Sequence, residues 1–169
     1  MNLIVAVDSN WGIGYKGKLL QSIPEDMKFF KQITTDKVVV MGDITFKSLP
    51  KQEPLKDRIN IVLSNESSLN NKNKDIIICS SLDQLFDQLK NYDSDDIFII
   101  GGESIYKQFL SYCKVVYITK IKKQYKADKY FPNLDNRFNW ELVSISDLKV
   151  YKDIQFRFLK YVNINNINK

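Results

Sequence analysis

The amino-acid sequence predicts an α/β fold, in which a central mixed, mainly parallel sheet of about eight strands is flanked by four helices. Short apolar runs alternate with helical segments along most of the chain, a pattern typical of parallel strands that are covered on both faces. Two of these runs, within 37–41 and 96–100, are apolar at consecutive positions. The last two strands follow each other without a helix, which predicts an antiparallel C-terminal edge.

The length of 169 residues is enough for one domain with a proper core. Residues 1–162 are predicted to form this domain, and the low-complexity residues 163–169 to form a frayed tail. A hydrophobic content of 44% is ordinary for a globular protein, and no run approaches the roughly 20 apolar residues of a membrane span. The N-terminus lacks the features of a signal peptide, so no membrane association is expected.

The inventory of reactive side chains excludes several kinds of site. The sequence contains no histidine, which excludes Ser-His-Asp triads and makes catalytic zinc sites improbable, so no metal is expected. Cys79 and Cys113 lack CxxC spacing and are expected to be buried free thiols of a cytoplasmic protein. The net charge is +5, but the lysines are spread along the chain, so nucleic-acid binding is not expected.

The N-terminal part begins with a buried strand over 2–8, followed by a flexible, glycine-containing loop over 9–21. A helix is predicted over 22–33, because Pro24 suits a first helical turn and Ser22 and Glu25 have the spacing of a capping box.

The later elements follow the same alternation of apolar runs and helical stripes. Ser81 and Gln84 have the spacing of a helix start, and Leu82, Leu85 and Leu89 form the apolar stripe of that helix. The expected elements after residue 36 are strand 37–41, helix 43–49, loop 50–57, strand 59–63, loop 64–74, strand 75–78, the helix after Ser81, strand 96–100, a helix ending near 112, strand 115–121 and strands over 140–145 and 154–158.

One acidic residue in the first of these helices lies on the wrong face. At helical spacing Asp26 falls with Phe29, Phe30 and Ile33, which form the apolar face. A carboxylate among apolar side chains is costly unless a hydrogen-bond donor pairs with it. Asp26 is therefore paired either by the protein itself or by a ligand.

Two strand-to-helix junctions carry glycine, within 41–45 and 100–104. Each would present backbone N–H groups at a helix N-terminus, which suits phosphate, and Thr45 and Ser104 add hydroxyl groups. Neither junction has the spacing of a P-loop or of the GxGxxG fingerprint. Either one alone is most simply a tight turn, but the pair favours a dinucleotide that lies across the strand ends.

Taken in order, the motifs of the chain resemble those of the dihydrofolate reductase family, from Leu3 to about Phe158. No single motif is specific, but their ordered set is. The motifs that carry the resemblance are Leu3–Asp8 with Ile13-Gly14, Ile23–Met27 with Phe30-Lys31, Val40–Gly42 with Thr45-Phe46, Asp57–Ser64, Ile99–Gly102 with Ile105-Tyr106, and Tyr117–Thr119.

The resemblance implies NADPH-dependent reduction of 7,8-dihydrofolate to tetrahydrofolate for one-carbon metabolism. It implies that Asp26 and Thr119 are catalytic, that Asp26 binds the pterin, and that Arg58 binds the glutamyl carboxylate. The implied substrate-binding residues are Ile4, Val5, Ala6, Asp26, Phe30, Leu49, Leu55, Arg58, Ile100, Tyr106 and Thr119.

The resemblance also implies a cofactor site, a cis bond between Gly101 and Gly102, binding of antifolate inhibitors and a monomeric state. The implied NADPH-binding residues are Ala6, Ile13, Gly14, Gly42, Thr45, Leu63, Ser64, Asn65, Ile100, Gly101, Gly102, Glu103, Ser104, Ile105 and Tyr106.

The chain departs from the family pattern at a few positions. Leu20-Gln21 stands where the family often has Pro-Trp, and Asp43 and Ser104 stand where basic residues often help to bind the 2′-phosphate of NADPH. Asn65, Lys72 and Lys74 are candidates to compensate. The alternatives are a related pterin or pyrimidine reductase, from which Arg58 distinguishes this chain, and a non-catalytic nucleotide- or RNA-binding domain.

Overall fold

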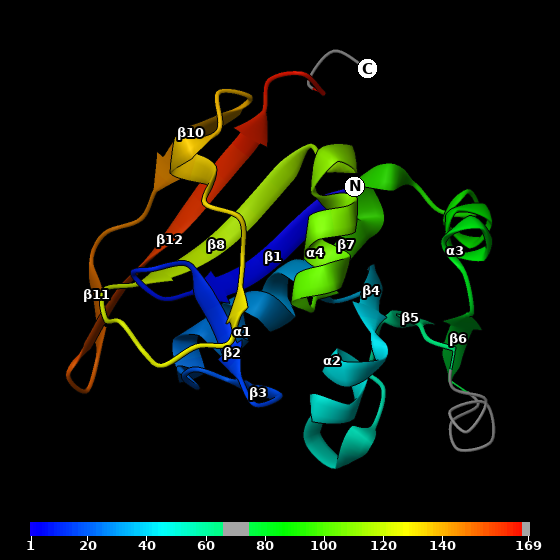
Figure 1. Cartoon of the computed structure of the whole chain (residues 1–169), viewed down its shortest axis with the longest axis horizontal. Coiled ribbons are helices and arrows are strands. Elements are labelled where there is room, and N and C mark those ends of the chain that lie inside the picture. Colours follow the sequence, from blue (N-terminus) through cyan, green and yellow to red (C-terminus); the bar gives the residue numbers. More distant parts are fainter. Residues whose placement is uncertain (66–74, 167–169) are drawn as a thin grey trace.

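The computed structural model describes residues 1–65 and 75–166, and its main sheet follows the predicted α/β plan. The strands lie in the order β10-β12-β8-β1-β7-β4-β5-β6, and β11 pairs with β12 (Figure 1). The strands of this sheet are β1 (Asn2–Val7), β4 (Val38–Gly42), β5 (Ile59–Leu63), β6 (Ile76–Cys79), β7 (Ile97–Gly101), β8 (Val115–Ile121), β10 (Trp140–Ile145), β11 (Lys149–Tyr151) and β12 (Ile154–Asn163).

The pairing directions confirm a mainly parallel sheet with an antiparallel edge. β1 pairs in parallel with β7 and β8, and β4 pairs in parallel with β5 and β7. At the edge, β12 pairs antiparallel with β8, β10 and β11. The short strand β11 was not predicted, because its three residues give too little alternation to stand out from a turn.

Helices cover both faces of the sheet, as the continuous apolar runs predict. The described part of the chain contains α1 (Pro24–Thr34), α2 (Asp43–Ser48), α3 (Leu82–Leu89) and α4 (Glu103–Phe109), and the 3-10 turns η1 (Pro50–Gln52), η3 (Ser94–Asp96), η4 (Leu110–Tyr112) and η5 (Leu134–Asn136). Val38 and Val40 pack on the side of α3 and α4, whereas Val39 and Met41 pack on the side of α1 and α2. The alternating side chains of one strand therefore enter two different cores.

The predicted flexible loop over 9–21 is wrong, because this segment forms strands. β2 (Gly12–Tyr15) pairs with β3 (Lys18–Leu19) and with β9 (Lys129–Tyr130), which makes a small second sheet beside the main one (Figure 1). Lys16 and Gly17 both have positive φ, +50° and +75°, and form the two-residue turn between β2 and β3. This is the conformation that a tight hairpin requires, and glycine adopts it readily.

The predicted capping box at the start of α1 is also wrong. Ile23 occupies the N-cap position, and no side chain caps the helix. Ile23 is only 1% exposed and packs with Ile121, Ile154 and Phe156, so burial of this side chain fixes the start of the helix. Pro24 lies in the first turn as predicted, and Ser81 caps α3 as predicted by accepting a bond from the Gln84 N–H.

The C-terminal strand includes residue 163, where the frayed tail was predicted to start. Asn163 is the last residue of β12 and is buried, and the Asn166 side chain donates to the carbonyls of Ser111 and Cys113. A hydrogen-bonded strand end thus replaces the first part of the expected tail.

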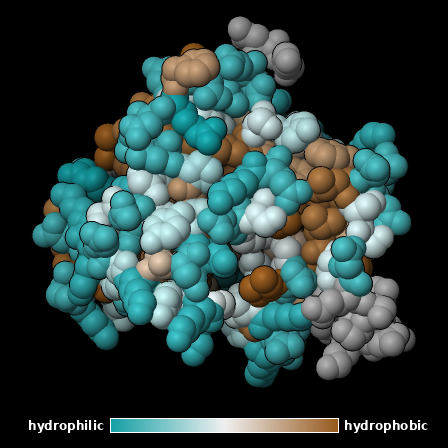
Figure 2. All heavy atoms as spheres, viewed as in Figure 1, coloured by the Kyte–Doolittle hydropathy of each residue, from teal (hydrophilic) through white to brown (hydrophobic). Residues whose placement is uncertain are grey.

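Both cysteines are free and buried, as predicted. The surface seen in Figure 2 is mostly hydrophilic, with apolar residues in separate groups. No helix among the described residues is long and apolar enough to cross a membrane.

Candidate active site

The two glycine junctions lie side by side at one edge of the sheet. Met41 of β4 is opposite Gly101 of β7, and Gly42 and Gly102 are the N-cap residues of α2 and α4. A Cβ at Gly102 would lie 3.3 Å from the Thr45 hydroxyl oxygen, and one at Gly42 would lie 3.2 Å from an Ile105 side-chain carbon. The two turns therefore approach each other so closely that side chains larger than hydrogen would crowd them.

Gly101 is the most constrained position of this edge. Its φ is +120°, and a Cβ would lie 3.1 Å from the hydroxyl oxygen of Tyr106. The peptide bond between Gly101 and Gly102 is cis. Both the backbone conformation and the space around it thus require glycine at Gly101.

Tyr106 joins this edge to the first strand. Its hydroxyl donates to the Ile4 carbonyl at 2.9 Å, inside the protein. Burial, and to a lesser degree the nearby charge of Asp26, raise the pKa of Tyr106 far above its ordinary value. The phenol therefore keeps its proton and remains a donor.

An open pocket of about 130 Å³ lies where these elements meet. The predicted site residues that line it are Val5, Ala6, Ile13, Gly14, Thr45, Ile100, Gly101, Gly102, Glu103 and Tyr106. The lining residues that the sequence analysis missed are Gly17, Lys18, Leu19, Ile44, Ser48 and Lys129.

Three of the six missed residues come from the β2–β3 hairpin, which forms one wall of the pocket. The turn signal that could have revealed it is Lys16-Gly17 between Tyr15 and Lys18. Leu19 and Ile44 are 66% and 63% exposed, and both line the pocket. Large apolar side chains left in water around a pocket indicate a surface that a ligand covers.

Asp8 holds the beginning of this hairpin in place. Its carboxylate accepts the backbone N–H groups of Asn10 (2.8 Å), Gly12 (2.7 Å) and Tyr125 (2.9 Å). Asp8 is 1% exposed, so these bonds replace the water that the carboxylate gives up. The wall of the pocket is thus tied both to β1 and to the segment after β8.

Asp26 lies on α1 and points at β8. The hydroxyl of Thr119, which is buried, donates to a carboxylate oxygen of Asp26 at 2.5 Å. Burial raises the pKa of Asp26, and the bond from Thr119 only partly opposes this effect. No other donor within the described residues pairs with this carboxylate, which leaves acceptor capacity for a ligand.

An apolar wall continues from Asp26 along α1. Phe30, Leu49 and Leu55 are only partly buried, and all three pack on a cluster that contains Ile4 and Ile100. All five are among the substrate-binding residues that the resemblance implies. The structure brings them into one cluster, although they come from five separate segments of the chain.

Arg58 marks the other end of this wall. Its guanidinium donates to the Thr34 hydroxyl at 3.2 Å and 3.3 Å and to the Lys56 carbonyl at 2.6 Å. Partial burial lowers the pKa of Arg58 from its ordinary value, yet an arginine stays charged. These contacts fix the position of the guanidinium at the C-terminal end of α1, and no carboxylate of the described residues pairs with it.

Several predicted cofactor residues do not line the pocket. Ile105 is buried beneath Gly42, and Ser104 is exposed and bonded to the Gln108 side chain at 2.9 Å. Leu63, Ser64 and Asn65 lie at the end of β5, next to β4 on the same edge of the sheet. Lys72 and Lys74, the proposed compensating cations, lie outside the described residues.

Leu20 and Gln21, which depart from the family pattern before α1, are not among the residues that line the pocket. Leu20 is half-buried, and the Gln21 amide donates to the adjacent Ser22 carbonyl at 3.4 Å. Trp11, from the same connection, is 6% exposed and stacks on Phe131 with ring centroids 6.3 Å apart.

Comparison with known proteins relates the chain to one enzyme family. The family model described as dihydrofolate reductase matches residues 1–163. A dihydrofolate reductase of Schistosoma mansoni is 40% identical over 162 residues, which cover 88% of this chain and 84% of the relative. A dihydrofolate reductase of Drosophila melanogaster is 34% identical over 158 residues, 87% of this chain and 86% of the relative. One from Buchnera aphidicola is 39% identical over 132 residues, 78% of each chain.

Proposed function

The chain belongs to the dihydrofolate reductase family, and we propose that it holds its substrate along α1, with the reacting ring at Asp26 and the glutamate tail at Arg58. Its function is the reduction of 7,8-dihydrofolate to tetrahydrofolate with NADPH, which makes it an NADP-dependent oxidoreductase.

The arrangement along α1 carries this proposal. Asp26 and Thr34, the residue that supports Arg58, are separated by eight positions, or about 12 Å along the helix axis. A hydrogen-bonding carboxylate, an apolar wall and a fixed guanidinium follow one another over this length. The order matches a molecule with a polar ring, an aromatic spacer and a carboxylate tail.

The roles of the side chains follow from their chemistry. Ionised Asp26 is an acceptor for the ring N–H and amino groups of the pterin, and these bonds favour a protonated pterin. Thr119 donates a hydrogen bond that orients the Asp26 carboxylate, and it is the second proposed catalytic residue. Arg58 suits a carboxylate because its planar guanidinium offers parallel donors. Water admitted to the site is the proposed source of the proton for the pterin nitrogen.

The residues at the glycine junctions fit NADPH. Gly42 and Gly102 are the N-cap residues of α2 and α4, and the N–H groups of a helix start suit phosphate oxygens. When bound, NADPH supplies the hydride for the pterin. Ala6, Ile100 and Tyr106 line the pocket at this edge, and the β2–β3 hairpin forms one wall of it. Orientation and exclusion of water are the contributions of the protein.

The loss of NADPH absorbance in the presence of 7,8-dihydrofolate tests the proposed substrate position. We expect turnover to saturate with dihydrofolate at a much lower concentration than with a 7,8-dihydropterin that lacks the benzoyl-glutamate tail. Equal KM values for the two substrates would argue against the position proposed for Arg58.

The same assay with NADH tests the cofactor preference. NADPH is expected to have the lower KM, although Asp43 is close to the end of β4 where a cation would help. Equal KM values for NADPH and NADH would contradict that preference.

We also propose that the protein acts as a monomer in the cytoplasm, that residues 1–162 form its single domain, and that it binds antifolates. The free, buried thiols of Cys79 and Cys113 are consistent with a reducing compartment. The acceptor capacity of Asp26 suits the aminopyrimidine ring of such inhibitors.

A further inference from the structure

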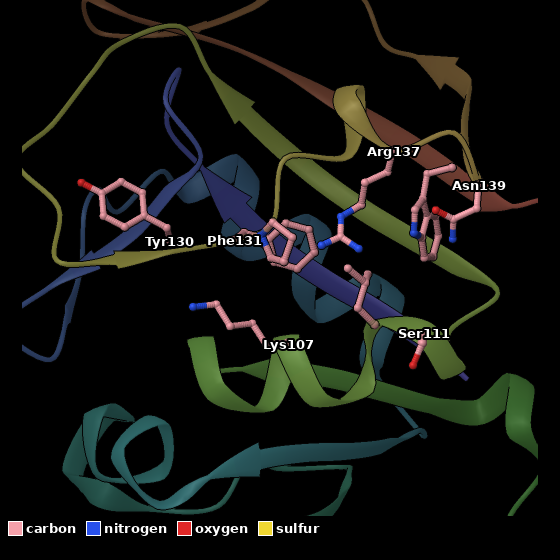
Figure 3. Close-up of a pocket in the computed structure, with 9 residues that line it drawn as sticks. Lys107, Ser111, Tyr130, Phe131, Arg137 and Asn139 are labelled. Carbon is pink, nitrogen blue, oxygen red and sulfur yellow. The ribbon is translucent and has the colours of Figure 1, made fainter.

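A second cavity, larger than the active-site pocket, lies beside α4. It has a volume of about 430 Å³ and opens between α4–η4 and the segment over 130–140 (Figure 3). Its lining residues are Lys107, Leu110, Ser111, Tyr130, Phe131, Pro132, Arg137, Asn139 and Trp140. None of these residues lines the active-site pocket, so the cavity is a separate space.

The apolar walls of this cavity are fixed by the core. Leu110, Phe131 and Trp140 are 4%, 2% and 6% exposed and belong to the main hydrophobic cluster. Phe131 also packs edge-on against Tyr106, with ring centroids 5.2 Å apart. Because core packing holds these side chains in place, the cavity does not collapse and has room for a small planar ligand.

The polar side of the cavity carries positive charge. Figure 3 shows the Arg137 side chain reaching from the segment after η5 toward Phe131 and α4. Within the described residues, neither the Arg137 guanidinium nor the Ser111 hydroxyl has a hydrogen bond or ion pair. The second cation, Lys107, pairs with Glu103 at 3.0 Å.

The acidic residues near this cavity are engaged elsewhere. No aspartate or glutamate is among its lining residues. Asp135 accepts the hydroxyl of Tyr161 at 2.5 Å, and Glu103 accepts both Lys107 and the Tyr130 N–H. Arg137 is therefore a free bidentate donor beside aromatic walls, and a carboxylate or phosphate is the group that this geometry prefers.

We propose that this cavity is a second ligand site, which binds a small planar aromatic anion with its ring inside the cavity and its carboxylate or phosphate on Arg137. The site is independent of the reaction and of the substrate position proposed above.

Binding of 2-naphthoate to the whole protein tests the proposal. The active site is first filled with NADP⁺ and folate, a pair that cannot react, and binding is then measured by calorimetry. We expect one-to-one binding with a Kd on the order of 0.1–1 mM, and backbone amide shifts in NMR spectra at Ser111 and Asn139. The uncharged isostere 2-naphthamide is expected to bind at least about 10-fold more weakly.

Variants show whether the anion is bound at Arg137. Arg137→Gln should weaken 2-naphthoate at least about 10-fold and leave 2-naphthamide unchanged, because only the anion uses the guanidinium. Lys90→Gln removes the same charge from an exposed pair with Asp87 and should change neither ligand. The proposal fails if the anion binds Arg137→Gln as well as the wild type, or binds only when the active site is empty. Phenyl phosphate in the same experiment distinguishes a phosphate from a carboxylate preference, and a failure of both anions rejects the site.

Discussion

The two halves of the proposed site, the glycine junctions and the residues along α1, are built by different means. The half at the glycine junctions is built from backbone, because Gly42, Gly101 and Gly102 leave no room for side chains. The half along α1 is built from a few side chains, Asp26 and Arg58, each held by a threonine. A backbone site recognises a phosphate by shape, whereas a side-chain site recognises particular donors and acceptors of the substrate. Substitutions at the glycine junctions should therefore weaken cofactor binding through backbone strain. Substitutions of Asp26 and Arg58 should impair turnover or substrate binding through the loss of a charge.

The largest effect is expected for Asp26, in the first turn of α1. Asp26→Asn should lower kcat with dihydrofolate at pH 7 by about 10²–10⁴, because the neutral amide cannot favour protonation of the pterin. The loss should be smaller at acidic pH, where the solvent protonates the substrate. Stopped-flow or steady-state loss of NADPH absorbance measures it.

Glu25→Gln is the matched control for Asp26→Asn. Glu25 is the adjacent residue and pairs with Lys149 at 2.7 Å on the exposed side of α1, so this variant should keep its turnover. Normal turnover of Asp26→Asn at pH 7 would show that the role proposed for Asp26 is wrong.

A glycine of the backbone half should give the next effect. Gly101→Ala puts a side chain at φ +120° and against Tyr106, which should cost about 1–3 kcal/mol. Fluorescence titration should show weaker NADPH binding, by about 5- to 150-fold if the whole cost falls on the complex. Gly102→Ala, at an ordinary φ of −86°, should be milder. If the two variants weaken NADPH binding equally, backbone strain is not the reason for a glycine at position 101.

A third variant tests the tail end of the side-chain half. Arg58→Lys should raise the KM for dihydrofolate about 10-fold with kcat nearly unchanged, because an ammonium group cannot make the two parallel bonds. The tail-free dihydropterin serves as the control, since its KM should not move. If the KM rises equally for dihydrofolate and for the tail-free dihydropterin, Arg58 supports the fold and does not bind the tail.

The smallest effect is expected at Asp43, the charged residue that follows Gly42. Asp43→Asn should improve the KM for NADPH relative to NADH by about 1.5- to 5-fold, because a partly exposed carboxylate repels phosphate only weakly. Asp83→Asn makes the same change in the first turn of α3 and should leave the ratio unaltered. An unchanged ratio in Asp43→Asn as well would place the 2′-phosphate away from Asp43.

The sequence predicted most of the main sheet, but not the β2–β3 hairpin that lines the pocket. Continuous apolar runs identified the parallel strands, and Asp26 stood out because a carboxylate on an apolar face needs a partner. The pairing of β2 with β9 depends on contacts between distant segments, held by Asp8 and Tyr125, and no local pattern encodes it. The start of α1 was missed for a related reason, since burial of Ile23 replaces a side-chain cap.

The pKa of Asp26 links the side-chain half to stability. Because burial raises this pKa in the folded protein, the folded state holds a proton that the unfolded chain releases. The free energy of unfolding should therefore fall as the pH rises from the ordinary pKa of an aspartate to the raised value, and then level off. Ionised Asp26 thus destabilises the free protein, and a ligand that pairs with the carboxylate relieves that cost.

The most direct test of this account is an NMR titration of the ¹³C-labelled Asp26 carboxyl group, with and without folate. The account predicts a pKa above the ordinary value of an aspartate in the free protein, and a lower pKa once the pterin donors pair with the carboxylate. A pKa at or below the ordinary value in the free protein, or one that folate does not change, would contradict the claim that the pterin is the partner of Asp26.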